Sequence, residues 1–99
     1  MTDQQQVLRG QEAAQVLDNE AFKLAMESLK TSVLDQWKAC PIRDQEGQTL
    51  LLQLAKLTDK FESLLIGMIE SGKFAQRQIE LDKLRNETKA RQFVRKVLG

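Results

Sequence analysis

Two apolar stripes at helical spacing, separated by a single proline, constrain the fold of this chain more than any other feature. The first stripe has an apolar side chain at every third or fourth position, at Phe22, Met26, Leu29, Val33 and Trp37. The second follows the same rule at Leu50, Leu54, Leu57, Phe61, Leu64 or Leu65, and Met68. This spacing is typical of helices, because apolar residues in a half-buried strand alternate instead. The sequence therefore predicts an all-α protein.

Pro41 determines where the two helices separate. Proline disfavours helical backbone at the residue before it, so we expect the first helix to end near Cys40. Residues 40–47 then form the turn, and residues 18–71 form a long antiparallel helical hairpin. The 99 residues are expected to make one domain, because a domain usually contains about 100–150 residues.

Polar residues at the expected helix starts agree with these boundaries. Thr2, followed three residues later by Gln5, matches a capping box and predicts a short helical segment within residues 1–17. Asp18 and Asp44 stand where the two hairpin helices should begin. A carboxylate there can accept hydrogen bonds from the free backbone N–H groups of the first helical turn.

The last third of the chain can be interpreted in two ways. Gly72 favours a helix end, since glycine commonly follows one, and residues 73–98 would then be a separate basic helix in a three-helix bundle. Glycine inside a helix costs only about 1 kcal/mol relative to alanine, so one helix can also continue through it. Residues 76–92 have too few apolar side chains to cover the second hairpin helix. We therefore expect a basic arm that projects from the hairpin.

The second stripe is wider than a single neighbouring helix requires. Leu51, Leu52 and Ala55 extend it beyond the arc of about 100° that one packing partner covers. The stripe should therefore be covered on two sides, by another helix of the same chain or by a second copy. We favour a second copy, because a chain of this size buries only roughly 60–65 % of its unfolded surface. The residues expected at this homo-oligomer contact are Leu50, Leu54, Leu57, Phe61, Leu65 and Met68, together with Trp37.

Charge is distributed unevenly along the chain. Residues 1–72 contain seven basic and eleven acidic side chains, a net charge of −4, and residues 73–99 contain eight basic and three acidic ones, a net charge of +5. This asymmetry indicates either contact between unlike surfaces of two copies or an anionic partner such as nucleic acid. A helix face that is merely solvated is the third interpretation. The residues expected to contact an anionic partner are Lys83, Arg85, Lys89, Arg91, Arg95 and Lys96.

No set of residues in the sequence indicates catalysis. Histidine is missing, and Cys40 is the one cysteine, so the usual activating base of a cysteine nucleophile is lacking. The five glycines are scattered singly, which does not fit a phosphate-binding loop. We therefore expect neither enzymatic activity nor a metal or cofactor.

Targeting signals are also lacking. The first residues have neither the basic nor the apolar region of a signal peptide. No unbroken apolar run exceeds three residues, whereas a membrane-spanning helix needs about 20. These patterns predict synthesis in the cytoplasm and no membrane partner.

Four segments, taken in order, resemble a known group of proteins. They are residues 18–22 (DNEAF), 35–38 (DQWK), 41–47 (PIRDQEG) and 70–75 (ESGKFA). Together they are similar to small all-helical proteins encoded by tailed bacteriophages and prophages, often beside head-assembly genes. The similarity covers roughly residues 9–76 and excludes the basic tail. The group has no assigned catalytic residues, and the resemblance implies a viral context in the host cytoplasm or the virion.

These observations together predict a non-enzymatic, self-associating protein that acts in phage head assembly or as a virion component. Its partners would be further copies of itself and other phage proteins. The alternative is a small nucleic-acid-binding or regulatory protein that uses the basic tail. A protein that inhibits a host enzyme by docking a helix on it is a further alternative.

Overall fold

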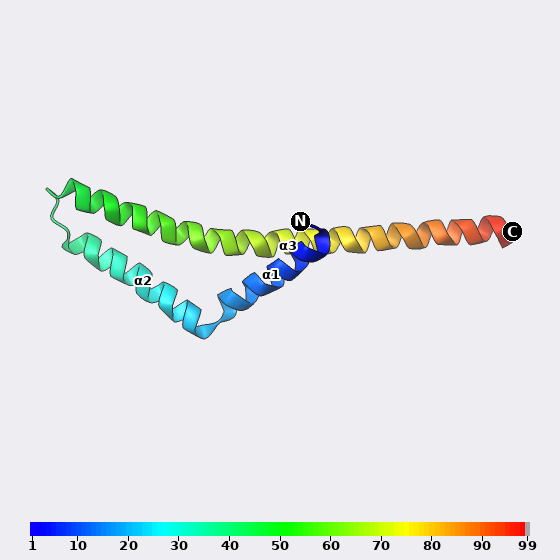
Figure 1. The fold of residues 1–99 in the computed structure, drawn as a ribbon, viewed down its shortest axis with the longest axis horizontal. Helices are drawn as coiled ribbons and strands as arrows, with labels where there is room; N and C mark the ends of the chain where they lie inside the picture. The colour runs from blue at the N-terminus through cyan, green and yellow to red at the C-terminus, as the bar shows by residue number, and fades with distance from the viewer. Residues whose placement is uncertain (99) are drawn as a thin grey trace.

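The structure, a computed structural model, describes residues 1–98 and consists of three helices. They are α1 (Asp3–Asp18), α2 (Glu20–Ala39) and α3 (Gln45–Leu98), and the described residues contain no strand. The molecule measures 83 × 27 × 17 Å. Figure 1 shows α3 running along its whole length, with α1 and α2 forming a V beside the first half of α3. The all-α prediction with a long helical hairpin is confirmed.

The extended basic arm is also present, because α3 continues through Gly72 without interruption. Its 54 residues correspond to a length of about 81 Å at 1.5 Å per residue. Of the two interpretations of Gly72, the helix end does not occur, and residues 73–98 are the second half of α3 instead of a separate helix. Figure 1 shows this half extending beyond the other two helices.

Local hydrogen bonds define the helix ends, two of them as predicted. Thr2 Oγ1 accepts a hydrogen bond from the backbone N–H of Gln5 at 3.2 Å, and the Gln5 side chain accepts one from the N–H of Thr2 at 3.0 Å. This reciprocal pair is the expected capping box. At the start of α3, Asp44 Oδ1 accepts a hydrogen bond from the N–H of Gly47 at 2.9 Å. Asp44 is therefore a cap, as its position indicated.

The cap expected at Asp18 is wrong by one residue. Asp18 is the last residue of α1, and Asn19 caps α2 by accepting a hydrogen bond from the N–H of Phe22 at 2.9 Å. Asn19 has extended backbone dihedrals, φ −68° and ψ 125°. One residue thus ends α1 and begins α2, which leaves no loop to absorb a change in angle between them.

Helix α2 ends where Pro41 requires. Cys40 adopts extended backbone, and its N–H donates to the carbonyl oxygen of Gln36 at 2.9 Å. The N–H of Asp44 then donates to the carbonyl oxygen of Pro41 at 3.0 Å, which closes the turn. The hairpin connection is therefore only a few residues long, and it holds the end of α2 next to the start of α3.

Two glycines, Gly10 and Gly72, pack closely against each other at the crossing of α1 and α3. A Cβ atom on Gly72 would lie 3.0 Å from the Cα of Gly10 and 3.0 Å from the carbonyl oxygen of Gln6. Ala13 and Ala75 are buried, and Ala75 has no exposed surface at all. Because these residues are so small, the two backbones meet directly. Gly72 is a contact residue within α3, where its position suggested a helix end.

The interior is otherwise small. The buried residues are Gly10, Ala13, Val33, Thr58, Gly72 and Ala75. The α2–α3 contact includes the rings of Phe22 and Phe61, with centroids 6.1 Å apart, and an ion pair of 2.7 Å between Lys30 and Glu62. The radius of gyration is 23.2 Å, against about 12.6 Å for a compact chain of this length. The single chain thus leaves most of its apolar side chains in contact with water.

Candidate functional site

A row of exposed apolar side chains follows α3 from the turn to the α1 crossing. Its members are Leu50, Leu54, Leu57, Phe61, Leu64 and Met68, which we call the leucine seam. They are 40–65 % exposed. Alternating steps of four and three residues keep them in line along the helix, as at the contact of a coiled coil. The leucine seam therefore has the spacing and the exposure that packing against another helix requires.

The seam brings together five of the seven residues expected at an oligomer contact. Leu65 is half-buried and is not part of it, whereas Leu64 is exposed and takes that place. The two neighbours fit the apolar spacing equally well in the sequence. Their burial depends on where α1 and α2 lie against α3, which spacing alone does not determine.

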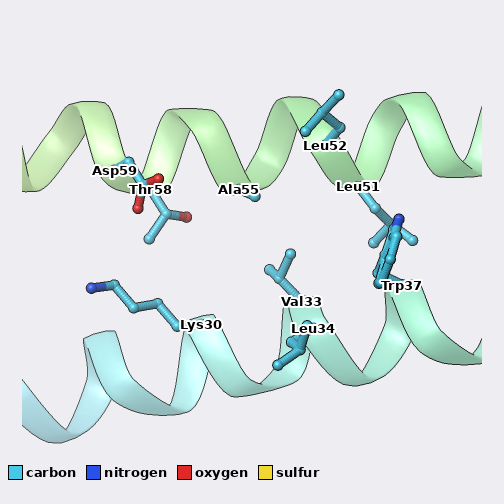
Figure 2. A pocket seen from close by; sticks show the side chains of 9 residues that line it. All are labelled: Lys30, Val33, Leu34, Trp37, Leu51, Leu52, Ala55, Thr58 and Asp59. Carbon is cyan, nitrogen blue, oxygen red and sulfur yellow. The ribbon is translucent and has the colours of Figure 1, made fainter.

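Trp37, the seventh expected residue, belongs to a different surface. It lines a groove between α2 and α3 near the turn, which we call the α2–α3 groove (Figure 2). The apolar residues that line the groove are Val33, Leu34, Trp37, Leu51, Leu52 and Ala55. The groove has a volume of about 230 Å³, and half of the Trp37 surface is exposed.

Most polar side chains of the groove already form a hydrogen bond or an ion pair within the chain. Thr58 Oγ1 donates a hydrogen bond to the carbonyl oxygen of Leu54 at 2.9 Å. Lys30 lies 2.7 Å from Glu62, and the hydrogen bond between them raises the pKa of the Lys30 ammonium above its usual value. Asp59 lines the groove as well, and in the part of the chain that the structure describes it forms no ion pair. The charge of Asp59 nevertheless helps to raise the pKa of Lys30, so it is partly balanced within the chain.

Sequence reasoning missed the groove because it depends on the angle between helices. The crossing at Gly10 and Gly72 holds one end of α1 against α3, and Asn19 then turns the chain back toward the start of α3 (Figure 1). The side chains that face each other across the groove include Val33, Ala55 and Thr58 (Figure 2). They are too short to fill the space that this geometry leaves. The one signal in the sequence was the small size of Ala55 within a leucine-rich helix.

The second half of α3 presents the predicted basic residues on an arm that no other helix covers. Every residue from 80 to 98, which we call the basic arm, is exposed. All six predicted cations lie on it, against three acidic side chains, which gives a net charge of +3. The one ion pair among the described residues of the arm joins Arg85 and Asp82 at 3.9 Å. The other five cations are therefore available to a partner.

The basic arm ends in an apolar cluster that was not among the expected contact residues. Phe93, Val94, Val97 and Leu98 are 50–81 % exposed. Residues four apart lie on the same side of a helix, so Phe93 with Val97, and Val94 with Leu98, form one broad apolar face. The sequence signal was present, because these are the last apolar residues of a mostly polar segment.

The described residues show neither an activated thiol nor a metal-binding cluster. Desolvation raises the pKa of the Cys40 thiol, and the charge of Asp44 and a weak hydrogen bond to its carboxylate raise it further. A raised pKa disfavours the thiolate, which is the nucleophilic form. Within residues 1–98, no group of three or more acidic or cysteine side chains could hold a metal ion. None of the helices there combines the length and apolarity needed to cross a bilayer.

Cys40 is accordingly expected to be dispensable. Cys40→Ser removes only weak contacts of the sulfur, which lies 3.8 Å from the carbonyl oxygen of Pro41 and 3.9 Å from Asp44. The variant should keep the oligomeric mass and the unfolding temperature of the wild-type protein within error, as measured by sedimentation and circular dichroism. A loss of association with unchanged helicity would instead indicate a role for the thiol.

Comparisons with known proteins identify no relative of this chain. No protein-family model matches it, and neither a curated protein nor a solved structure is significantly similar.

Proposed function

We propose that this protein is a non-enzymatic structural protein that self-associates through the leucine seam. The observation that carries the proposal is the size of the exposed surface. The chain exposes 8325 Å², whereas a compact protein of 11.3 kDa exposes about 5,700 Å². The excess, about 2,600 Å², exceeds the 1,200–2,000 Å² that a specific protein–protein interface usually buries.

The composition of the exposed surface supports the same proposal. Six large apolar side chains of the seam are 40–65 % exposed in one continuous row. Burying apolar surface stabilises a complex by about 25 cal/mol per Å², and exposed apolar rows of this size mark interaction sites. The side chains of the seam are leucine, phenylalanine and methionine, so packing them against another helix buries no polar side-chain group that needs a hydrogen-bond partner.

The biological setting that we propose is phage head assembly or the virion itself. What supports it is the resemblance of the four ordered segments between residues 18 and 75 to small helical phage proteins, together with the exposed apolar row on α3. Virion assembly requires many copies of a few proteins to bind one another, and a long helix with an exposed apolar row suits that task.

Analytical ultracentrifugation of the wild-type protein tests the proposal directly. We expect a mass that is a multiple of 11.3 kDa and that increases with concentration. A protein that sediments as a monomer at millimolar concentration would contradict self-association. Addition of purified phage heads, where available, then tests whether the protein binds the particle.

The exposure of the basic arm favours nucleic-acid binding as a second candidate function. Phosphate contacts by five free cations would give an affinity that falls steeply with salt. Only Phe93 offers an aromatic ring for base stacking on the arm, so sequence-independent contact with the phosphate backbone is the expected mode.

Neutralising the basic arm separates the two candidates. With Arg85, Lys89, Arg91, Arg95 and Lys96 replaced by Gln, helix content should be retained, because these side chains make at most one intrachain ion pair. Self-association should become weaker without being abolished, since each exposed ion pair contributes only about 0.2–1 kcal/mol. It should also become less sensitive to salt. If association is unchanged while DNA binding is lost, the basic arm binds nucleic acid and takes no part in self-association.

A further inference from the structure

We propose that the apolar end of the basic arm docks in the α2–α3 groove of a second copy. The inference rests on the proposed self-association and specifies a second contact, separate from the leucine seam. The incoming face consists of Phe93, Val94, Val97 and Leu98. It would pack against Val33, Leu34, Trp37, Leu51, Leu52 and Ala55.

The groove has the size and the lining for this occupant. A cavity of about 150 Å³ accommodates a benzene ring, and the groove measures about 230 Å³. It can thus receive the ring of Phe93 with part of a neighbouring aliphatic side chain. Figure 2 shows the groove bordered by side chains of both α2 and α3, so an inserted ring would contact both helices.

The arm of the same molecule cannot reach this groove. Ala55 and Phe93 lie on one continuous helix, about 57 Å apart at a rise of about 1.5 Å per residue. Figure 1 shows the two regions at opposite halves of the molecule. Any arm that enters the groove must therefore belong to another copy.

Among the exposed apolar residues, the arm end is the best candidate to fill the groove. Met1 and Ile42 are more than four-fifths exposed, but both lie outside the helices, so neither belongs to an apolar helix face. The arm end offers four adjacent apolar side chains on a preformed helix. A preformed helix loses less conformational entropy on binding than a flexible segment does.

Charge favours contact between the basic arm and residues 1–72 of another copy over contact between two basic arms. The arm has a net charge of +3, and residues 1–72 have a net charge of −4. Lys30 at the groove is paired with Glu62 and also interacts with the charge of Asp59, so it is the net negative charge of residues 1–72 as a whole that attracts Arg95 and Lys96 of an incoming arm. Two arms packed side by side would instead bring like charges together, which is unfavourable.

This contact joins two different surfaces that lie far apart on each molecule. Two antiparallel copies that exchange arms would satisfy both contacts and close as a dimer, whereas in any other arrangement each added copy still presents a free arm or a free groove. Outside the closed pair, the copies would link head to tail into an open chain, or into a larger ring if the rotation between copies closes. The contact provides a way to build assemblies larger than the seam alone would form.

Single substitutions on each surface, with matched controls, test the docking. Phe93→Glu places a charge at the arm end, and Leu84→Glu places the same charge elsewhere on the arm. Leu34→Glu does so at the groove wall, and Leu24→Glu does so on α2 outside the groove. All four leucine and phenylalanine side chains are 49–67 % exposed, so the fold should tolerate each change. We expect Phe93→Glu and Leu34→Glu to raise the concentration needed for association by about tenfold or more. The controls Leu84→Glu and Leu24→Glu should have little effect on it.

Mixing the Phe93→Glu and Leu34→Glu proteins tests whether the arm binds the groove and not another arm. The Phe93→Glu protein retains an intact groove, and the Leu34→Glu protein retains an intact arm. One productive contact is therefore possible in each mixed pair, and the mixture should form a larger species than either protein alone. An interface between two arms or between two grooves would show no such recovery.

Trp37 provides a readout that does not depend on a groove variant. It is the single tryptophan of the chain and lines the groove, so an inserted arm should shift its fluorescence emission to shorter wavelength as concentration rises. The Phe93→Glu protein should lack this shift, and the Leu84→Glu protein should retain it.

Two results would overturn the docking, and they differ from failure of the proposed function. If the wild-type protein associates while Phe93→Glu and Leu34→Glu change neither its mass nor the Trp37 emission, the seam alone is responsible. If Phe93→Glu weakens growth but mixing brings no recovery, the arm binds a surface other than the groove. A strictly monomeric wild-type protein would instead refute self-association as a whole.

Discussion

Gly72→Gln is expected to detach α1 from α3. Any side chain at residue 72 starts with a Cβ atom 3.0 Å from the Cα of Gly10 and 3.0 Å from a backbone oxygen of Gln6. Backbone on both sides cannot move aside as a flexible side chain would. Forcing atoms into such a packed contact costs about 1–3 kcal/mol, which outweighs the gain of about 0.5–1 kcal/mol from replacing glycine in a helix.

The detachment has several measurable consequences. The 16 residues of α1 have no other extensive contact, so their amide hydrogens should exchange much faster, and helix content by circular dichroism should fall. Helix α3 should remain intact, since glutamine favours helical backbone more than glycine does.

Gly67→Gln is the matched control, in the same helix and five residues away. A Cβ atom at Gly67 would meet no atom within 4 Å. This variant should therefore be as stable as the wild-type protein or more so, by up to about 1 kcal/mol. Equal destabilisation of the two variants would refute the tight crossing of α1 and α3.

The second large effect is expected from charges on the leucine seam. Leu57→Glu together with Leu64→Glu places two carboxylates in the middle of the row, at positions 65 % and 52 % exposed. The monomer should keep its fold, because water already reaches both side chains. Full burial of a leucine stabilises by about 1.5–3 kcal/mol, so the loss of two should weaken association by roughly two orders of magnitude or more.

Sedimentation of this variant should show the monomer at concentrations where the wild-type protein is associated. Leu81→Glu together with Leu84→Glu is the control, since both leucines are similarly exposed but lie on the basic arm outside the seam. Association that survives the seam variant unchanged would exclude the seam as the interface.

The sequence by itself determined where most helices begin and end. Thr2, Asp44 and Pro41 act on backbone groups within a few residues of themselves, so their effects can be recognised without knowledge of the fold. The one error, Asp18 in place of Asn19, arose because both side chains can cap a helix. Which of them does so depends on how far α1 extends.

The apolar spacing also determined the seam, except for the choice between Leu64 and Leu65. Both residues suit a helical stripe, and their burial differs only because the other helices lie nearer one of them. Apolar spacing identifies the face of a helix, but whether a residue at the edge of that face is buried depends on where the other helices pack.

Only the tertiary structure decided the role of Gly72 and the presence of the groove. Glycine in a sequence indicates a helix end and a close contact equally well, and the presence of Gly10, 62 positions earlier, makes it a contact. The groove follows from the same crossing, because the angle it imposes leaves the small side chains of Val33, Ala55 and Thr58 unable to fill the space between α2 and α3. Hydrogen bonds at helix ends are local, and a sequence shows both partners. Helix crossings join residues that are distant in the sequence, so their geometry appears only when the chain is folded.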